Sequence, residues 1–197
     1  MRDDNDSVAG GKARLRRQAL AARDALPAGD RAAAAETIAA RPFPVSIGVG
    51  TIVSGFIPIR SEINPLPLMR RLVAAGASLA LPVVAGRGRP LILRAYAFGD
   101  PLQSGQWGIR EPGPEAPEVV PDVMLVPLAA FDRTGHRIGY GAGYYDMTIN
   151  RARSLKRVTA VGMAFAAQEI AQVPATRRDA RLDLVLTERE TIDCRRA

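Results

Sequence analysis

Apolar residues recur at helical spacing near the start of the chain. Within residues 12–26, basic residues separate four apolar positions that lie three or four residues apart: Leu15, Ala19, Ala22 and Leu26. This spacing predicts a helix. A second helix is expected over residues 31–40, with Asp30 as its N-cap, and a third between Pro65 and Gly76.

Six apolar runs are short and rich in β-forming residues, which predicts strands. They cover residues 51–59, 78–84, 91–98, 122–131, 157–165 and 182–188. A further helix is expected over residues 144–154. Because strands alternate with helices, we predict an α/β fold: a largely parallel sheet with flanking helices and a helical N-terminal segment. Residues 99–121 are rich in Gly and Pro and form a long connection, of the kind that is functional or disordered.

Length and composition favour one domain over residues 11–197, preceded by a flexible leader over residues 1–10. Prolines or charges interrupt each apolar stretch before it reaches about 18 residues, so no membrane span is expected. The leader lacks the layout of a secretory signal, and the one cysteine, Cys194, has no partner for an internal disulfide. We therefore expect a cytoplasmic protein.

Arginine carries nearly all of the positive charge. The formal net charge is +7, from 27 Lys and Arg against 20 Asp and Glu, and only Lys12 and Lys156 are lysines. Arginine suits bidentate contact with phosphate or carboxylate, so this balance indicates nucleic acid or a small anionic ligand. A coding bias toward arginine would give the same composition.

Three glycines alternate with other residues in RIGYGAGYYD, residues 137–146, between a predicted strand and a predicted helix. In this order of elements, backbone N–H groups and a helix N-terminus face an anion, and glycine lets the backbone approach it closely. Open α/β sheets bind ligands at the carboxyl ends of their strands, where this loop lies. The loop lacks the ending of a Walker loop and the spacing of the dinucleotide fingerprint, so a tight turn without a ligand stays an alternative.

Five segments follow one another along the chain: KARLR (12–16), SEINP (61–65), WGIREP (107–112), LAAFDRTGHRIGYGAGYYD (128–146) and DARLDLVLTE (179–188). In this order they resemble the motifs of the 5-formyltetrahydrofolate cyclo-ligase family. The resemblance implies a cyclo-ligase-like domain with a Rossmann-like, three-layer fold. It also implies ATP-dependent conversion of 5-formyltetrahydrofolate to 5,10-methenyltetrahydrofolate, with release of ADP and phosphate, through a phosphorylated formyl intermediate.

The resemblance implies roles for the matched positions. It assigns ATP binding to Lys12, Arg16, Arg137, Ile138, Gly139, Tyr140, Gly141, Ala142, Gly143, Tyr144 and Tyr145. It assigns folate binding to Ile57, Glu62, Tyr140, Gly141, Ala142, Gly143 and Tyr144. Lys12, Arg137 and Tyr144 are the expected catalytic residues, and Asp146 and Asp183 are the expected Mg²⁺ ligands. Phosphoryl transfer needs positioned cations around the phosphate, and these residue types supply them.

Two alternative functions stay open. Ala142, Met147, Ala166 and Arg178 depart from the usual family pattern, which fits a cyclo-ligase-like paralogue that acts as a phosphotransferase on another substrate. The basic N-terminal helix fits a nucleic-acid-binding module, although aromatic residues make up only 5% and no RNP-like strand occurs. We expect a monomer whose partners are 5-formyltetrahydrofolate and ATP, without membrane or nucleic acid. Trp107 either packs or stacks on the pterin ring.

Overall fold

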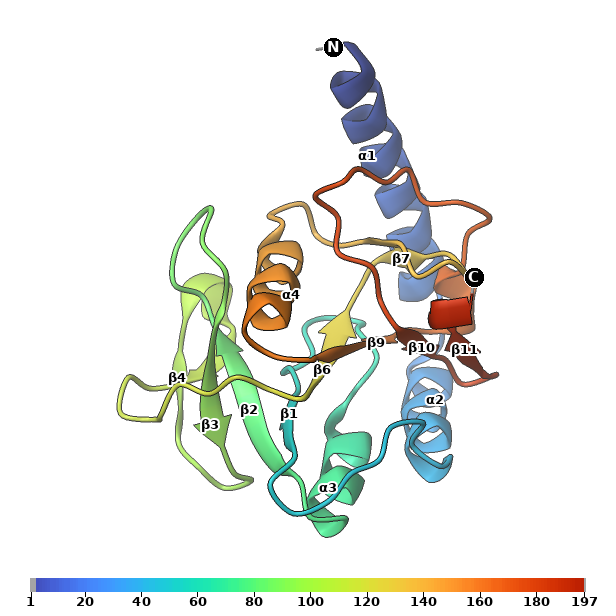
Figure 1. Cartoon of the computed structure of the whole chain (residues 1–197). Helices are drawn as coiled ribbons and strands as arrows, with labels where there is room; N and C mark the ends of the chain where they lie inside the picture. Colours follow the sequence, from blue (N-terminus) through green and yellow to red (C-terminus); the bar gives the residue numbers. More distant parts are fainter. Residues whose placement is uncertain (1–2, 197) are drawn as a thin grey trace.

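The computed structural model describes residues 3–196, with side chains from residue 10 to residue 195. A seven-stranded sheet runs through it in the order β11-β10-β9-β6-β1-β2-β3 (Figure 1). Its strands are β1 (Ile52–Ser54), β2 (Ser78–Val83), β3 (Ile92–Tyr96), β6 (Val123–Pro127), β9 (Thr159–Met163), β10 (Leu184–Leu186) and β11 (Thr191–Asp193). The pairings from β2 through β1, β6 and β9 to β10 are parallel, and an antiparallel strand closes each edge. The prediction of a largely parallel α/β sheet is confirmed.

Helices cover both faces of the sheet because its central strand is apolar on both sides. Every residue of β6 is buried, as is typical of a parallel strand with helices on both faces. One set of alternate β6 residues packs with α2 (Ala28–Ala40) and α3 (Leu66–Ala74), and the other set packs with α4 (Tyr144–Leu155). The result is the expected three-layer arrangement, visible in Figure 1.

The long helix α1 (Asp3–Asp24) packs at one end of the sheet and reaches beyond it (Figure 1). Its Ala19 is buried in a small apolar cluster with a two-stranded ribbon, β7 (Ala130–Phe131) and β8 (Arg137–Ile138). This packing sets α1 beside the glycine loop that follows β8. The helix begins within the segment expected as a leader, and the division into leader and domain stays a prediction.

The second helix begins earlier than its sequence pattern suggests. Pro27 occupies the N-cap position of α2, and no side chain donates or accepts a capping hydrogen bond there. The prediction of Asp30 as N-cap is therefore wrong. Pro27 has the extended backbone that precedes a helix, so Asp30 falls inside the first turn, where its charge favours the helix dipole.

The Gly- and Pro-rich connection over residues 99–121 contains regular structure. Strands β4 (Leu102–Ser104) and β5 (Arg110–Pro112) form an antiparallel hairpin around a short 3-10 turn (Gln106–Gly108). Two further 3-10 turns lie at Ala166–Gln168 and Cys194–Arg196. Among residues 3–196, no helix combines the length and apolarity that crossing a membrane requires.

Candidate active site

The glycine loop between β8 and α4 needs glycine for its backbone conformation. Gly141 has φ +103° and Gly143 has φ +69°, a region where other residues pay steric strain. Gly143 is also the N-cap residue of α4. From α1, Arg16 Nε donates to the Gly139 carbonyl at 2.6 Å, and its guanidinium lies 3.7 Å from the position of a Cβ on Gly141. A cation and a helix N-terminus therefore meet at this loop.

A pocket of about 270 Å³ opens beside the loop. It gathers ten of the sequence-predicted site residues: Ile57, Glu62, Arg137, Gly139, Tyr140, Ala142, Gly143, Tyr144, Tyr145 and Asp146. The remaining predicted residues do not line it: Lys12, Arg16, Ile138, Gly141 and Asp183. A larger cavity of about 730 Å³ lies among α3, β2, β3 and residues 112–117, and it contains none of the predicted residues.

Arg137 is the buried cation of the pocket, with 3% of its side chain exposed. Its Nη1 donates to the Ala180 carbonyl, and its Nη2 donates to Asp146 Oδ1 at 2.9 Å. Burial lowers the pKa of the Arg137 guanidinium, and the neighbouring carboxylates of Asp146 and Asp179 oppose that effect. The guanidinium thus joins the start of α4 to the segment before β10.

Asp146 faces the pocket from the first turn of α4. Its Oδ1 accepts both the Arg137 bond and a bond from the Ala180 N–H at 3.0 Å. Among the described residues, no three or more His, Cys, Asp or Glu side chains gather closely enough to hold a metal ion. A single carboxylate fits Mg²⁺ only together with phosphate oxygens and water, which is the ligand set that Mg²⁺ prefers beside a nucleotide.

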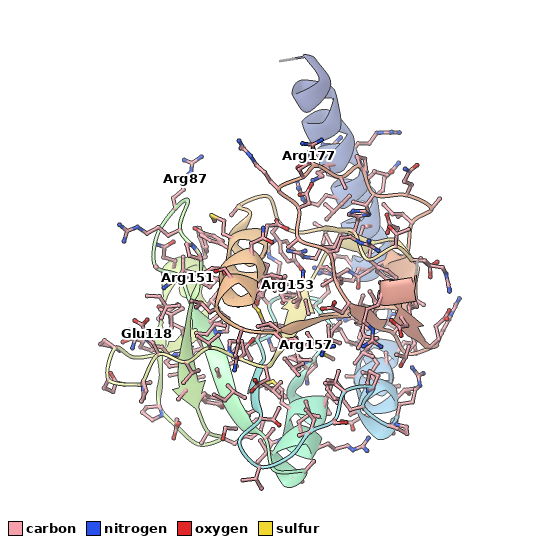
Figure 2. All side chains as sticks on the ribbon, in the orientation of Figure 1. Arg87, Glu118, Arg151, Arg153, Arg157 and Arg177 are labelled. Carbon is pink, nitrogen blue, oxygen red and sulfur yellow. The ribbon has the colours of Figure 1, made fainter. Side chains whose placement is uncertain are left out.

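Asp183 does not line the pocket and lies apart from Asp146, so the expectation that these two aspartates come together as Mg²⁺ ligands is wrong. Its Oδ2 accepts from Arg153 at 2.7 Å and from the Ala160 N–H at 2.7 Å. Arg153, labelled in Figure 2, belongs to the last turn of α4. Asp146 belongs to the first turn, and their separation of seven residues corresponds to about 10 Å along a helix. The reason is strand direction: Asp183 precedes a strand parallel to β9, which places it at the amino ends of the strands.

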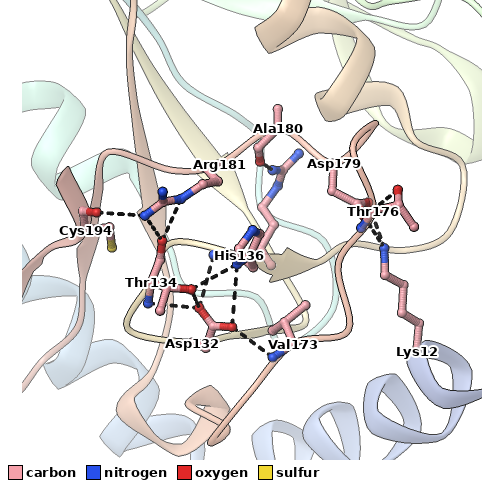
Figure 3. A network of polar contacts seen from close by, with 11 residues as sticks. Lys12, Asp132, Thr134, His136, Val173, Thr176, Asp179, Ala180, Arg181 and Cys194 are labelled. Atoms are coloured by element: carbon pink, nitrogen blue, oxygen red, sulfur yellow. Dashed lines mark hydrogen bonds and ion pairs between the residues drawn. The ribbon is translucent and has the colours of Figure 1, made fainter. Parts of the chain in front are cut away.

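Asp179 is the partner of the predicted residue Lys12, and sequence reasoning missed it. Both of its carboxylate oxygens lie 2.7 Å from Lys12 Nζ, and it also accepts from the Thr176 N–H at 2.6 Å (Figure 3). Burial alone raises the pKa of Asp179, but the bonds from Lys12 and Thr176 outweigh it and hold that pKa low. The segment DARLD holds two aspartates, and the first of them is the one that faces the α1 cation.

Glu62 lines the same pocket from the segment that follows β1. Its Oε2 accepts from the Ile59 N–H at 2.9 Å, and its carboxylate accepts from the Tyr140 hydroxyl. Burial raises the pKa of Glu62, while these two bonds and the charge of Arg23 act against the rise. Burial also raises the pKa of Tyr140, so its hydroxyl stays protonated and donates to Glu62.

Trp107 stands at the mouth of the pocket, in the turn of the β4–β5 hairpin. It has φ +57°, an unfavourable conformation for a bulky side chain, and 71% of the residue is exposed. Its ring centroid lies 6.0 Å from that of Tyr144, with the planes tilted by 54°. An exposed aromatic ring held in this way is available to a flat ligand.

Comparison with known proteins establishes the family of the chain. The model of the 5-formyltetrahydrofolate cyclo-ligase family matches residues 8–188, a range that includes every predicted site residue. The chain belongs to this family. The 5-formyltetrahydrofolate cyclo-ligase of Mycolicibacterium smegmatis is 33% identical over 189 residues, covering 92% of this chain and 95% of that protein. The Escherichia coli K12 protein of the same name is 32% identical over 141 residues, covering 68% and 76%.

A solved structure supports the family assignment. The 5,10-methenyltetrahydrofolate synthetase of Aquifex aeolicus has a TM-score of 0.74 at 28% identity, with 93% of each chain covered. The motifs that resemble the family are also those that meet in space. Arg16 contacts Gly139, Tyr140 contacts Glu62, and Asp146 accepts from the Ala180 N–H.

Proposed function

We propose that this protein converts 5-formyltetrahydrofolate and ATP to 5,10-methenyltetrahydrofolate, ADP and phosphate. One observation carries the proposal: a single pocket is lined by the half-buried carboxylate of Glu62, the buried Arg137 and a glycine loop at a helix N-terminus. These are groups suited to a pterin, a transferred phosphoryl group and a nucleotide. Family membership supports the same reaction.

The folate is proposed to lie between Glu62 and the glycine loop. A pterin presents N–H donors that a carboxylate accepts. Glu62 faces the pocket, and Ile59 and Tyr140 use only part of its hydrogen-bonding capacity. Ile57 lines the apolar side of the same wall. Trp107 and Tyr144 are proposed to hold the ring system from the mouth.

The nucleotide phosphates are proposed to lie on the glycine loop. Gly141 and Gly143 carry no Cβ that would block a phosphate, and the N-terminus of α4 favours negative charge. Arg16 is already at the loop, and Lys12 is held nearby by Asp179. We assign Asp179 the role of orienting Lys12 toward the phosphates.

The reaction is proposed to proceed in two steps. The formyl oxygen forms a bond to the γ-phosphorus, and the bond from that phosphorus to ADP breaks. The second folate nitrogen then attacks the formyl carbon and loses its proton, and phosphate leaves with the former formyl oxygen. Arg137 and Lys12 supply the fixed positive charge that phosphoryl transfer requires, and Tyr144 orients the folate. Mg²⁺, held by Asp146, would neutralise charge on the phosphates.

The proposal is tested by incubating purified protein with ATP, Mg²⁺ and 5-formyltetrahydrofolate and measuring the absorbance of the methenyl product. Formation of that product with one ADP released per turnover is the expected result, and omission of ATP is the control. ADP formation that depends on another acceptor, without methenyl product, would favour a phosphotransferase on the same fold. The monomeric state and cytoplasmic location expected from the sequence are part of this proposal.

A further inference from the structure

Arg23 is a buried charge that belongs to none of the family motifs discussed above. It lies in the last turn of α1, and only 3% of its side chain is exposed. A guanidinium removed from water needs hydrogen-bond partners to offset its desolvation. The partners of Arg23 therefore indicate what the residue is for.

Those partners belong to the two segments that carry Glu62 and the glycine loop. Arg23 Nε donates to Ser61 Oγ at 3.0 Å, and Nη1 donates to the Tyr140 hydroxyl at 2.6 Å. Ser61 precedes Glu62, and Tyr140 donates to the Glu62 carboxylate. The Ser61 hydroxyl in turn donates to Asp24 Oδ1, so α1 holds this segment through two side chains.

We infer that Arg23 is a positioning residue that holds Glu62 and the Tyr140 hydroxyl in the arrangement that receives the folate. This inference rests on the proposed function. The guanidinium is planar and offers donors along two edges, so it reaches Ser61 and Tyr140 at once. Lysine has one ammonium group on a flexible stem and would keep the charge without this fixed geometry.

The charge of Arg23 also acts on Glu62. The charged and titratable groups that act on Glu62 are Arg23 from α1, Tyr140 from the glycine loop and Tyr145 from α4. Asp24 accepts from Ser61, the residue before Glu62. Asp24 is 61% exposed, so water screens its charge, and Tyr140 and Tyr145 are neutral because burial raises their pKa values. Removing the Arg23 charge would therefore raise the pKa of Glu62. Glu62 becomes protonated as the pH falls through its pKa. With a raised pKa this happens at a higher pH, so the acidic limb of the pH–activity profile should move to higher pH.

The experiment compares Arg23→Gln, Arg23→Lys and Tyr140→Phe with the wild-type protein, using methenyl formation. Arg17→Gln is the matched control, because Arg17 is an exposed arginine on the same helix. Loss of hydrogen bonds to a charged group should raise the KM for 5-formyltetrahydrofolate by about tenfold to a hundredfold in Arg23→Gln, with a much smaller change in the KM for ATP. The acidic limb of kcat/KM should move to higher pH in Arg23→Gln and stay near the wild-type position in Arg23→Lys.

A double-mutant cycle separates positioning from general loss of stability. If Arg23 acts through Tyr140, the effects of Arg23→Gln and Tyr140→Phe on the folate KM should be less than additive. A folded Arg23→Gln protein with an unmoved acidic limb and a wild-type folate KM would overturn the inference. If Arg23→Gln does not fold, the Arg23→Lys variant provides the test. A raised folate KM in Arg23→Lys supports the inference, and an unchanged folate KM overturns it. Absence of turnover in the wild-type protein would instead overturn the proposed function, and this inference with it.

Discussion

Replacing Gly141 separates the conformational need for glycine from its role at a phosphate. Alanine at φ +103° costs ~1–2 kcal/mol of strain. Its Cβ would lie 3.7 Å from the Arg16 guanidinium, an ordinary contact, so Gly141→Ala adds little beyond strain in the free protein. For a chain of this length, we expect the melting temperature to fall by about 2–8 °C. Valine adds two further methyl groups to that Cβ, beside Arg16 and in the region proposed for the phosphates.

The nucleotide affinity should respond differently from the stability. One lost hydrogen bond to a charged phosphate is worth about 1.5–3 kcal/mol, or roughly ten- to a hundredfold in Kd. We therefore expect a Kd for ATP that is at least about tenfold weaker in Gly141→Val than in the wild-type protein, measured by calorimetry at a temperature where both are folded. The Kd for ATP of Gly141→Ala should lie between those of the wild-type protein and Gly141→Val.

Gly50 provides the matched control. It has φ +87°, a Cβ there would meet nothing within 4 Å, and it precedes β1 at the amino end of the sheet, away from the glycine loop. Gly50→Ala should lower the melting temperature as Gly141→Ala does and leave the Kd for ATP unchanged. Equal ATP affinities in folded Gly141→Val and Gly50→Ala proteins would refute the placement of the phosphates on this loop.

Three further predictions concern carboxylates. Glu62→Gln should weaken folate binding by ~1–3 kcal/mol and ATP binding much less, as measured by titration of each ligand. Equal losses for both ligands would show that Glu62 stabilises the fold and does not contact the folate. Asp146→Asn should raise the Mg²⁺ concentration for half-maximal activity. It should also lower the melting temperature without ATP, because the buried Arg137 loses its counter-charge. A normal Mg²⁺ requirement in the folded variant would remove the metal role of Asp146. Burial alone raises the pKa of Asp132, but bonds from Thr134, Val173 and His136 outweigh it and hold that pKa below its ordinary value (Figure 3). Its stabilisation is therefore present above about pH 4 and lost as pH falls through the lowered pKa, so the melting-temperature gap between wild type and Asp132→Asn should narrow in acid.

Sequence reasoning succeeded where a local pattern decides the structure. The helix over 144–154 became α4, and the glycine loop before it lies at the pocket as expected. It failed for Asp183 because the end of the sheet at which a residue lies depends on strand direction, which the local pattern does not contain. Arg23 was missed for a related reason. Its partners Ser61 and Tyr140 lie 38 and 117 residues away, and nothing near Arg23 in the sequence marks it as buried.

The hairpin turn at the mouth of the pocket has a practical consequence for measurement. Trp107 is the only tryptophan in the chain, and it lies against Tyr144 with most of its surface open to water. Its indole fluorescence therefore reports the polarity around this one side chain, and no second tryptophan contributes to the signal. A ligand that covers the ring should shift the emission toward shorter wavelength, so each ligand could be titrated alone by intrinsic fluorescence, without turnover and without an added label.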